Sequence, residues 1–94
     1  MRRYTLVLLA LLAVSPAFAE SKAKCDDLTN YMSGVAVGRD KGVPMDQAIA
    51  DSKKKYTDVM DQAHALMPIR ATYDKPEMNP KAIALATANA CANF

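Results

Sequence analysis

The sequence predicts an all-α fold, a small antiparallel bundle of three helices, or of four if the central helix breaks at Pro68, clasped by one disulfide. Three observations lead to this fold class. Apolar residues recur at three- and four-residue spacings, glycines and prolines separate the periodic segments, and two cysteines lie near the two ends of the helical part. A strand-like run is confined to residues 35–37, which is too short to form a sheet.

Residues 1–19 have the features of a signal peptide. Arg2 and Arg3 provide a positive start, an apolar run follows, and the small residues of Ala-Phe-Ala precede an expected cleavage after Ala19. The apolar run is shorter than the roughly 20 residues that span a bilayer, so a retained anchor is the less favoured alternative. We therefore expect a periplasmic protein with one helical domain, residues 20–94, and no membrane insertion after cleavage.

The charge balance depends on this leader. The chain has 12 Lys and Arg against 10 Asp and Glu, and Arg2 and Arg3 account for the whole excess. Without them the domain is neutral and lacks the basic surface that neutralises phosphates. Nucleic acids and anionic membranes are therefore not expected partners.

Cys25 and Cys91 are predicted to form one intramolecular disulfide. An even cysteine count in an exported protein favours this pairing, although a disulfide-linked dimer and free thiols remain alternatives. In the chain-entropy model a loop of this length stabilises the fold by roughly 4 kcal/mol. Such a staple matters because a domain this small buries only a small core.

The first helix is predicted over residues 25–39. Asp26 and Asp27 lie in its first turn, where the helix dipole favours negative charge. Gly42 is placed to stop it, because glycine takes the left-handed C′ conformation without strain. Pro44 then opens the next helix as a first-turn residue.

A long central helix is predicted over residues 45–67. Its apolar stripe consists of Met45, Ile49, Tyr56, Val59, Ala63 and Leu66, with Ser52 filling one position. Proline inside a helix removes a hydrogen bond and clashes with the preceding turn, so Pro68 is expected to end or kink it. Residues 69–73 would then continue as another turn or two.

The last helix is predicted over residues 80–92. Asn79 is its expected N-cap, and Pro80 its first residue. Because this helix is rich in alanine, it can approach a neighbour closely. We expect Gly34 and Gly38 of the first helix to pack against it, with a homodimer contact as the rival interpretation.

No catalytic, metal or cofactor site is predicted. His64 is the single histidine, and Asp61 one turn before it would complete only two ligands, fewer than a zinc site requires. A solvated surface histidine is the favoured interpretation. Three hydroxyl residues could act as a nucleophile beside it, but the sequence around each of them does not indicate that role; they are Ser33, Ser52 and Thr87.

The methionines beyond the leader allow three interpretations. They could bind Cu(I) through thioethers, form an adaptable surface for client proteins, or fill gaps in a small core. They are Met32, Met45, Met60, Met67 and Met78. Because they are scattered along the sequence, core filling is favoured. The run Lys53-Lys54-Lys55 is interpreted as a solvated helix face rather than a docking patch.

The two turns carry the residues most suited to an interaction. Arg39 could cap carbonyls at its own helix end, or pair with an acid across the turn; Asp40 lies beside it. Tyr73 could bury its ring and donate a hydrogen bond from its hydroxyl. These three residues are the candidate interaction site.

The order of short motifs resembles a loosely defined group of short, mostly uncharacterised exported proteins of Gram-negative bacteria. The matching residues are Cys25, Arg39, Asp40, Gly42, Val43, Tyr73, Pro76 and Cys91. A capping serine is common in that group where this chain has Pro44, and Pro68 is a second departure. The resemblance implies a periplasmic helical domain with two cysteines and implies no activity.

The functional expectation is a small non-enzymatic binding protein whose partner is another protein, as for an inhibitor or an immunity protein. It would be a monomer or a homodimer. A periplasmic acid-stress chaperone is the alternative, because protonation of the carboxylates would charge the domain strongly at low pH. An enzyme is the third and least favoured hypothesis.

Overall fold

The computed structural model describes residues 22–92, which form four helices and no strand. The first helix covers residues 22–40 and is followed by α2 (Met45–Lys55), α3 (Val59–Asp74) and α4 (Pro80–Cys91). The predicted leader and its cleavage site lie outside the described residues.

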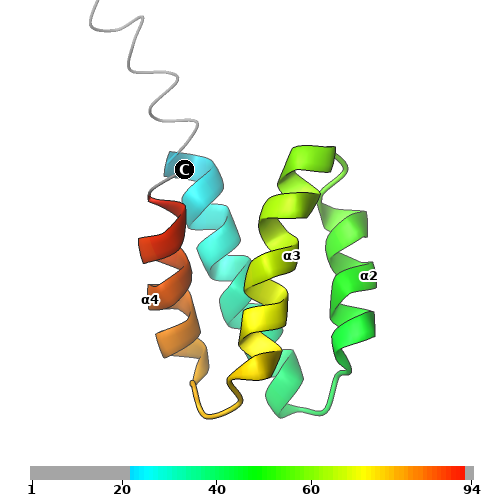
Figure 1. The fold of residues 1–94 in the computed structure, drawn as a ribbon, viewed down its shortest axis with the longest axis vertical. Coiled ribbons are helices and arrows are strands. Elements are labelled where there is room, and N and C mark those ends of the chain that lie inside the picture. The colour runs from blue at the N-terminus through cyan, green and yellow to red at the C-terminus, as the bar shows by residue number, and fades with distance from the viewer. Residues whose placement is uncertain (1–21, 93–94) are drawn as a thin grey trace, which may run out of the picture.

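The helices form an up-and-down bundle in which each helix runs antiparallel to the one before it (Figure 1). The first helix lies between α4 on one side and the α2–α3 pair on the other. A disulfide between Cys25 and Cys91, with Cα atoms 5.7 Å apart, joins the start of the first helix to the end of α4. The predicted all-α bundle and its disulfide are therefore confirmed, and the chain adopts the four-helix form.

The buried core lies along the first helix and is completed by one or two apolar residues from each of the other helices. It consists of Leu28, Met32, Val35, Ala36, Ala48, Ala65, Ile69, Ile83 and Cys91. Three of these nine residues are alanines, so the helices can pack closely around the larger side chains. Met32 and Ile69 are fully buried at the centre.

The prediction of one central helix over residues 45–67 is wrong. The chain leaves the helical conformation at Tyr56 (φ −101°, ψ 104°), and Asp58 is also extended (φ −77°, ψ 135°). The Asp58 side chain accepts hydrogen bonds from the backbone N–H groups of Met60 and Asp61 and so caps a new helix. An unbroken helix would carry Val59 along the inward face, whereas the turn leaves Val59 76% exposed.

Pro68 neither ends nor separates a helix, because α3 continues through it to Asp74. The residues that follow it are held by packing: Ile69 is fully buried and Thr72 almost fully. The Thr72 hydroxyl also donates to the Pro68 carbonyl at 2.7 Å. Tertiary burial thus outweighs the one hydrogen bond that proline removes.

The local turn signals are confirmed at two of the three connections. Gly42 has a φ of 94°, the left-handed conformation expected at the end of the first helix. The Asn79 side chain accepts from the N–H of Ala82 at 2.8 Å, and Pro80 is the first residue of α4. Pro44 lies one position earlier than predicted, at the N-cap of α2.

The glycine pair of the first helix does not pack against α4 as predicted. Gly34 is exposed, and a Cβ placed on it would meet no atom within 4 Å. A Cβ on Gly38 would lie 3.6 Å from Val43 Cγ2, in the turn that follows. The disulfide joins the first helix to α4, and Ile83 of α4 lies in the same buried core as the apolar residues of the first helix.

Candidate functional site

A cavity of about 540 Å³ opens at the disulfide end of the bundle. The start of the first helix, the turn between α2 and α3, and the first turns of α3 surround it. Its lining residues are Ala23, Lys24, Cys25, Asp27, Leu28, Tyr56, Asp58, Met60, Asp61, His64 and Cys91. Apolar atoms and the disulfide form much of its surface, and carboxylates lie around them.

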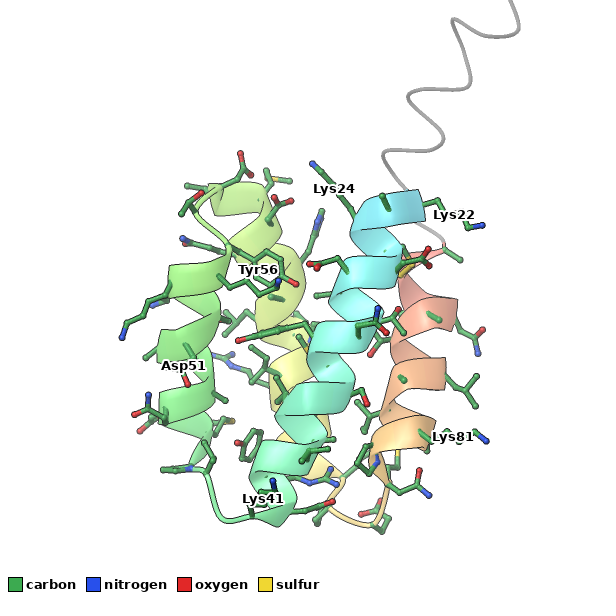
Figure 2. The ribbon with its side chains drawn as sticks, turned by 180° about the vertical axis from the view of Figure 1, so that it is seen from behind. Lys22, Lys24, Lys41, Asp51, Tyr56 and Lys81 are labelled. Atoms are coloured by element: carbon green, nitrogen blue, oxygen red, sulfur yellow. A yellow bond between two sulfur atoms is a disulfide. The ribbon has the colours of Figure 1, made fainter. Side chains whose placement is uncertain are left out.

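One wall is built by Tyr56, which leaves α2 and reaches toward the first helix (Figure 2). Its hydroxyl donates to Asp27 Oδ2 at 2.9 Å, and its ring meets Tyr31 edge-on at 5.5 Å between centroids. The ammonium of Lys55 lies over both rings, 5.5 Å from the centroid of Tyr31 and 5.4 Å from that of Tyr56. Lys55 Nζ also lies 3.3 Å from Asp27 Oδ1, so one carboxylate ties the end of α2 to the first helix.

This cluster keeps its tyrosines protonated. Burial, followed by the hydrogen bond to Asp27 and the charge of that carboxylate, raises the pKa of Tyr56 well above its ordinary value. Burial and the charge of Asp51 raise the pKa of Tyr31 as well. The neutral hydroxyl of Tyr56 is therefore a stable hydrogen-bond donor over the whole physiological pH range.

Another wall is formed by the beginning of α3. Asp58, Met60, Asp61 and His64 all line the cavity from this helix and its cap. Lys24, on the first helix, lies 3.9 Å from Asp61, measured between Nζ and Oδ1. Lys24 lies within 4 Å of Asp61, and Lys55 within 4 Å of Asp27, so the three lining carboxylates exceed these two cations by one negative charge.

The predicted interaction residues Arg39, Asp40 and Tyr73 lie at the other end of the bundle, near the turn that joins the first helix to α2. The Arg39 guanidinium, 7% exposed, donates to the carbonyls of Thr72 at 2.7 Å, Lys75 at 3.2 Å and Met78 at 2.7 Å. Its other contact is Asp40 Oδ1, at 2.9 Å from Nη2. Of the two roles considered from sequence, Arg39 does not cap its own helix end; it caps the end of α3 and pairs with the adjacent Asp40.

Tyr73 lies at the same end of the bundle and contacts the turn between the first helix and α2. Its hydroxyl donates to the Val43 carbonyl at 2.7 Å, which fixes the turn before α2. Burial raises the pKa of Tyr73, and the nearby Arg39 charge partly opposes this shift. Arg39 and Tyr73 are therefore engaged in holding two loops, and their part in any interaction stays a prediction.

The other side chains considered from the sequence fall into two groups. His64 and Asp61 both line the cavity, whereas the Ser52 and Thr87 hydroxyls donate to Ile49 and Ile83 carbonyls in their own helices. Within residues 22–92, no group of three or more His, Cys, Asp or Glu side chains is arranged to hold a metal ion.

Sequence reasoning missed the cavity because it depends on the break at residues 56–58. A continuous helix would leave no room for Tyr56 to turn toward Asp27. The signal that could have revealed the break was Thr57-Asp58, since threonine and aspartate are common at helix starts. The apolar spacing that continues across this point concealed it.

Comparisons with protein-family models, with curated proteins and with solved structures gave no significant match. The resemblance to short exported proteins of Gram-negative bacteria therefore stays a prediction. None of the helices in the described part of the chain combines the length and the hydropathy needed to cross a membrane.

Proposed function

We propose that this protein is a non-enzymatic binding protein of the periplasm, and that it holds a partner protein at the cavity of the disulfide end. The supporting observation is the combination of an open, largely apolar cavity with three lining carboxylates, Asp27, Asp58 and Asp61, which exceed the two lysines beside them by one negative charge. Such a surface suits a partner segment that inserts an apolar side chain and carries Lys or Arg beside it.

The surface around the cavity favours a protein over a small molecule. Met60 on its edge is 62% exposed, and its neighbour Val59 is also strongly exposed. Exposed apolar surface therefore extends from the cavity onto the α2–α3 turn. A ligand confined to the cavity would leave the part on the turn uncovered. A helix or loop of another protein would cover both.

The test is site-specific photocrosslinking in the periplasm of the producing bacterium. A photoreactive residue replaces Met60, and a matched control replaces Leu85, which is exposed on α4 away from the cavity. We expect one partner to be linked through position 60, and Asp61→Lys to lower that yield at least about fivefold. The same proteins linked at equal yields from both positions would contradict the proposal.

A second candidate function is acid-stress protection. The observation that favours it is the structural use of carboxylates: Asp27 anchors Tyr56 and Lys55, Asp40 holds Arg39, and Asp58 caps α3. At low pH the domain would gain a large positive net charge as its carboxylates are neutralised, and the repulsion between like charges would loosen the bundle. Protection of a client enzyme from aggregation at pH 2 to 3 would support this function, and retained near-UV circular dichroism without protection would exclude it.

A further inference from the structure

Helix α3 places the single histidine of the chain between two exposed thioethers. Met60 is 62% exposed and Met67 70% exposed, whereas Met32 in the core is completely buried. His64, between them in sequence, is half-buried. Neither Met60 nor Met67 therefore fills a gap in the core, which was the favoured interpretation of the methionines from sequence.

The spacing brings the three side chains onto one face of the helix. Residues three and four positions apart on an α-helix have Cβ atoms about 5–6 Å from each other, so His64 neighbours Met60 on one side and Met67 on the other. Met60 and His64 line the same cavity wall. Because methionine is unbranched and has three rotatable bonds, each sulfur can move toward the imidazole without a change in the backbone.

The donor set determines which metal would fit. Thioethers are soft, uncharged ligands that select Cu(I), and imidazole is an accepted ligand for copper. Asp61 lines the same cavity beside Met60 and contributes a negative charge that attracts a cation, partly offset by Lys24 at 3.9 Å. A divalent hard cation would find a poor ligand set here, since two of the three donors are thioether sulfurs.

We infer that Met60, His64 and Met67 form a binding site for Cu(I), with Sδ of each methionine and one imidazole nitrogen as the ligands. The metal binds without redox change, and no bond of the protein is broken. The inference is independent of the proposed protein partner. The methionines of the sequence are scattered, and it is the helical spacing around His64 that assembles two of them.

The binding test uses Ag(I) as the probe. It has the same charge and ligand preference as Cu(I), and it needs no reductant, which would reduce the Cys25–Cys91 disulfide. The disulfide-bonded protein, labelled with ¹³C at its methionine methyl groups, is titrated with silver nitrate in chloride-free buffer. We expect the methyl signals of Met60 and Met67 and the ring signals of His64 to shift together and saturate at one equivalent.

Other patterns overturn the inference. Shifts confined to one methionine, shifts spread evenly over all methionines including buried Met32, or no shift at all each exclude this three-ligand site. Zn(II) serves as the control cation, and we expect it to leave both methyl signals unchanged. Movement of both methyl signals with Zn(II) would contradict a site selective for soft metals.

Matched variants then test each ligand. Met60→Leu, Met67→Leu and His64→Gln should each weaken Ag(I) binding at least about tenfold in isothermal titration calorimetry. Met45→Leu, at the start of α2 and distant from the cavity, should bind as the wild type does. Because Met60 and Met67 are exposed, their variants should keep the wild-type circular dichroism. Unchanged affinity in the methionine variants would overturn the inference.

Discussion

Arg39 is the most heavily used polar side chain of the bundle. Its guanidinium reaches three carbonyls from the end of α3 and the loop before α4, although it belongs to the first helix. The last carbonyls of a helix have no partner within the helix itself, so a fixed fork of donors satisfies several of them at once. One side chain thereby holds three segments of the chain in place.

Arg39→Lys should therefore destabilise the protein although it keeps the charge. A lysine ammonium cannot span the three carbonyls, and each lost bond from a charged donor contributes about 1.5–3 kcal/mol before relaxation. We expect a loss of about 2 kcal/mol in urea unfolding. Arg70→Lys, on the exposed face of α3, is the control and should change stability by less than about 0.5 kcal/mol. Equal effects of the two variants would contradict a bridging role for Arg39.

Ionisation of Tyr56 makes the free energy of unfolding depend on pH in the alkaline range. Its folded-state pKa is raised by burial and by Asp27, so the folded protein keeps the proton that the unfolded chain loses above about pH 10. This contribution to the free energy of unfolding is complete below that pH and is lost as pH rises toward the folded-state pKa. Tyr31 and Tyr73 act in the same direction.

Tyr56→Phe should accordingly reduce the fall of stability with pH, as measured by urea unfolding between pH 8 and pH 11. The phenylalanine cannot ionise, so the difference between folded and unfolded proton binding disappears at this position. Tyr73→Phe is the comparison and should reduce the slope less, since Arg39 opposes the pKa shift of Tyr73. A slope unchanged in Tyr56→Phe would refute this assignment.

The turn between α2 and α3 is the element that decides the shape of the bundle. It converts one expected helix into two antiparallel helices and directs Tyr56 toward the first helix. Asp58 caps the start of α3 by accepting hydrogen bonds from two backbone N–H groups. The Gln62 side chain adds a bond from its amide to the Tyr56 carbonyl at 2.7 Å, which ties α3 to the residue where α2 ends.

Asp58→Ala should destabilise the protein by about 1 kcal/mol, because two N–H groups of the first turn of α3 lose their acceptor. Asp58→Asn retains an acceptor oxygen and should keep most of the stability. Thermal unfolding followed by circular dichroism distinguishes the two variants. If the asparagine variant loses as much as the alanine variant, the carboxylate charge is responsible and the hydrogen-bonded cap is not.

The disulfide clasps the whole bundle. It links residues 66 positions apart and joins the first helix to the last, next to the cavity. The core that the bond supports is small, with several alanines among its buried residues. The stability of a bundle with so little buried apolar surface depends on the disulfide, which lowers the conformational entropy of the unfolded chain.

Cys25→Ser should lower the free energy of unfolding by about 4 kcal/mol, the value that the chain-entropy model assigns to a loop of this length. Cys91→Ser and the reduced wild-type protein should lose a similar amount, since all three lack the same bond. Thermal melts with and without reductant provide the measurement. Coinciding wild-type melts would show that the bond contributes nothing to stability.

The features that could be predicted from sequence are those that neighbouring residues determine. Gly42 stops a helix because glycine alone takes a φ of 94° without strain, and Asn79-Pro80 starts one because the side chain and the ring suit its first turn. The disulfide followed from a count of two cysteines. The all-α class followed from a helical spacing that persists along the chain.

The features that could not be predicted depend on contacts between distant residues. The apolar spacing continues from α2 into α3 and does not indicate the break between them. The break is stabilised by contacts of Tyr56 with Asp27 and Tyr31 on the first helix. Pro68 remains inside α3 because Ile69 and Thr72 are buried beside it. The cavity follows from this break, since free energies of packing exceed the local preferences that a sequence displays.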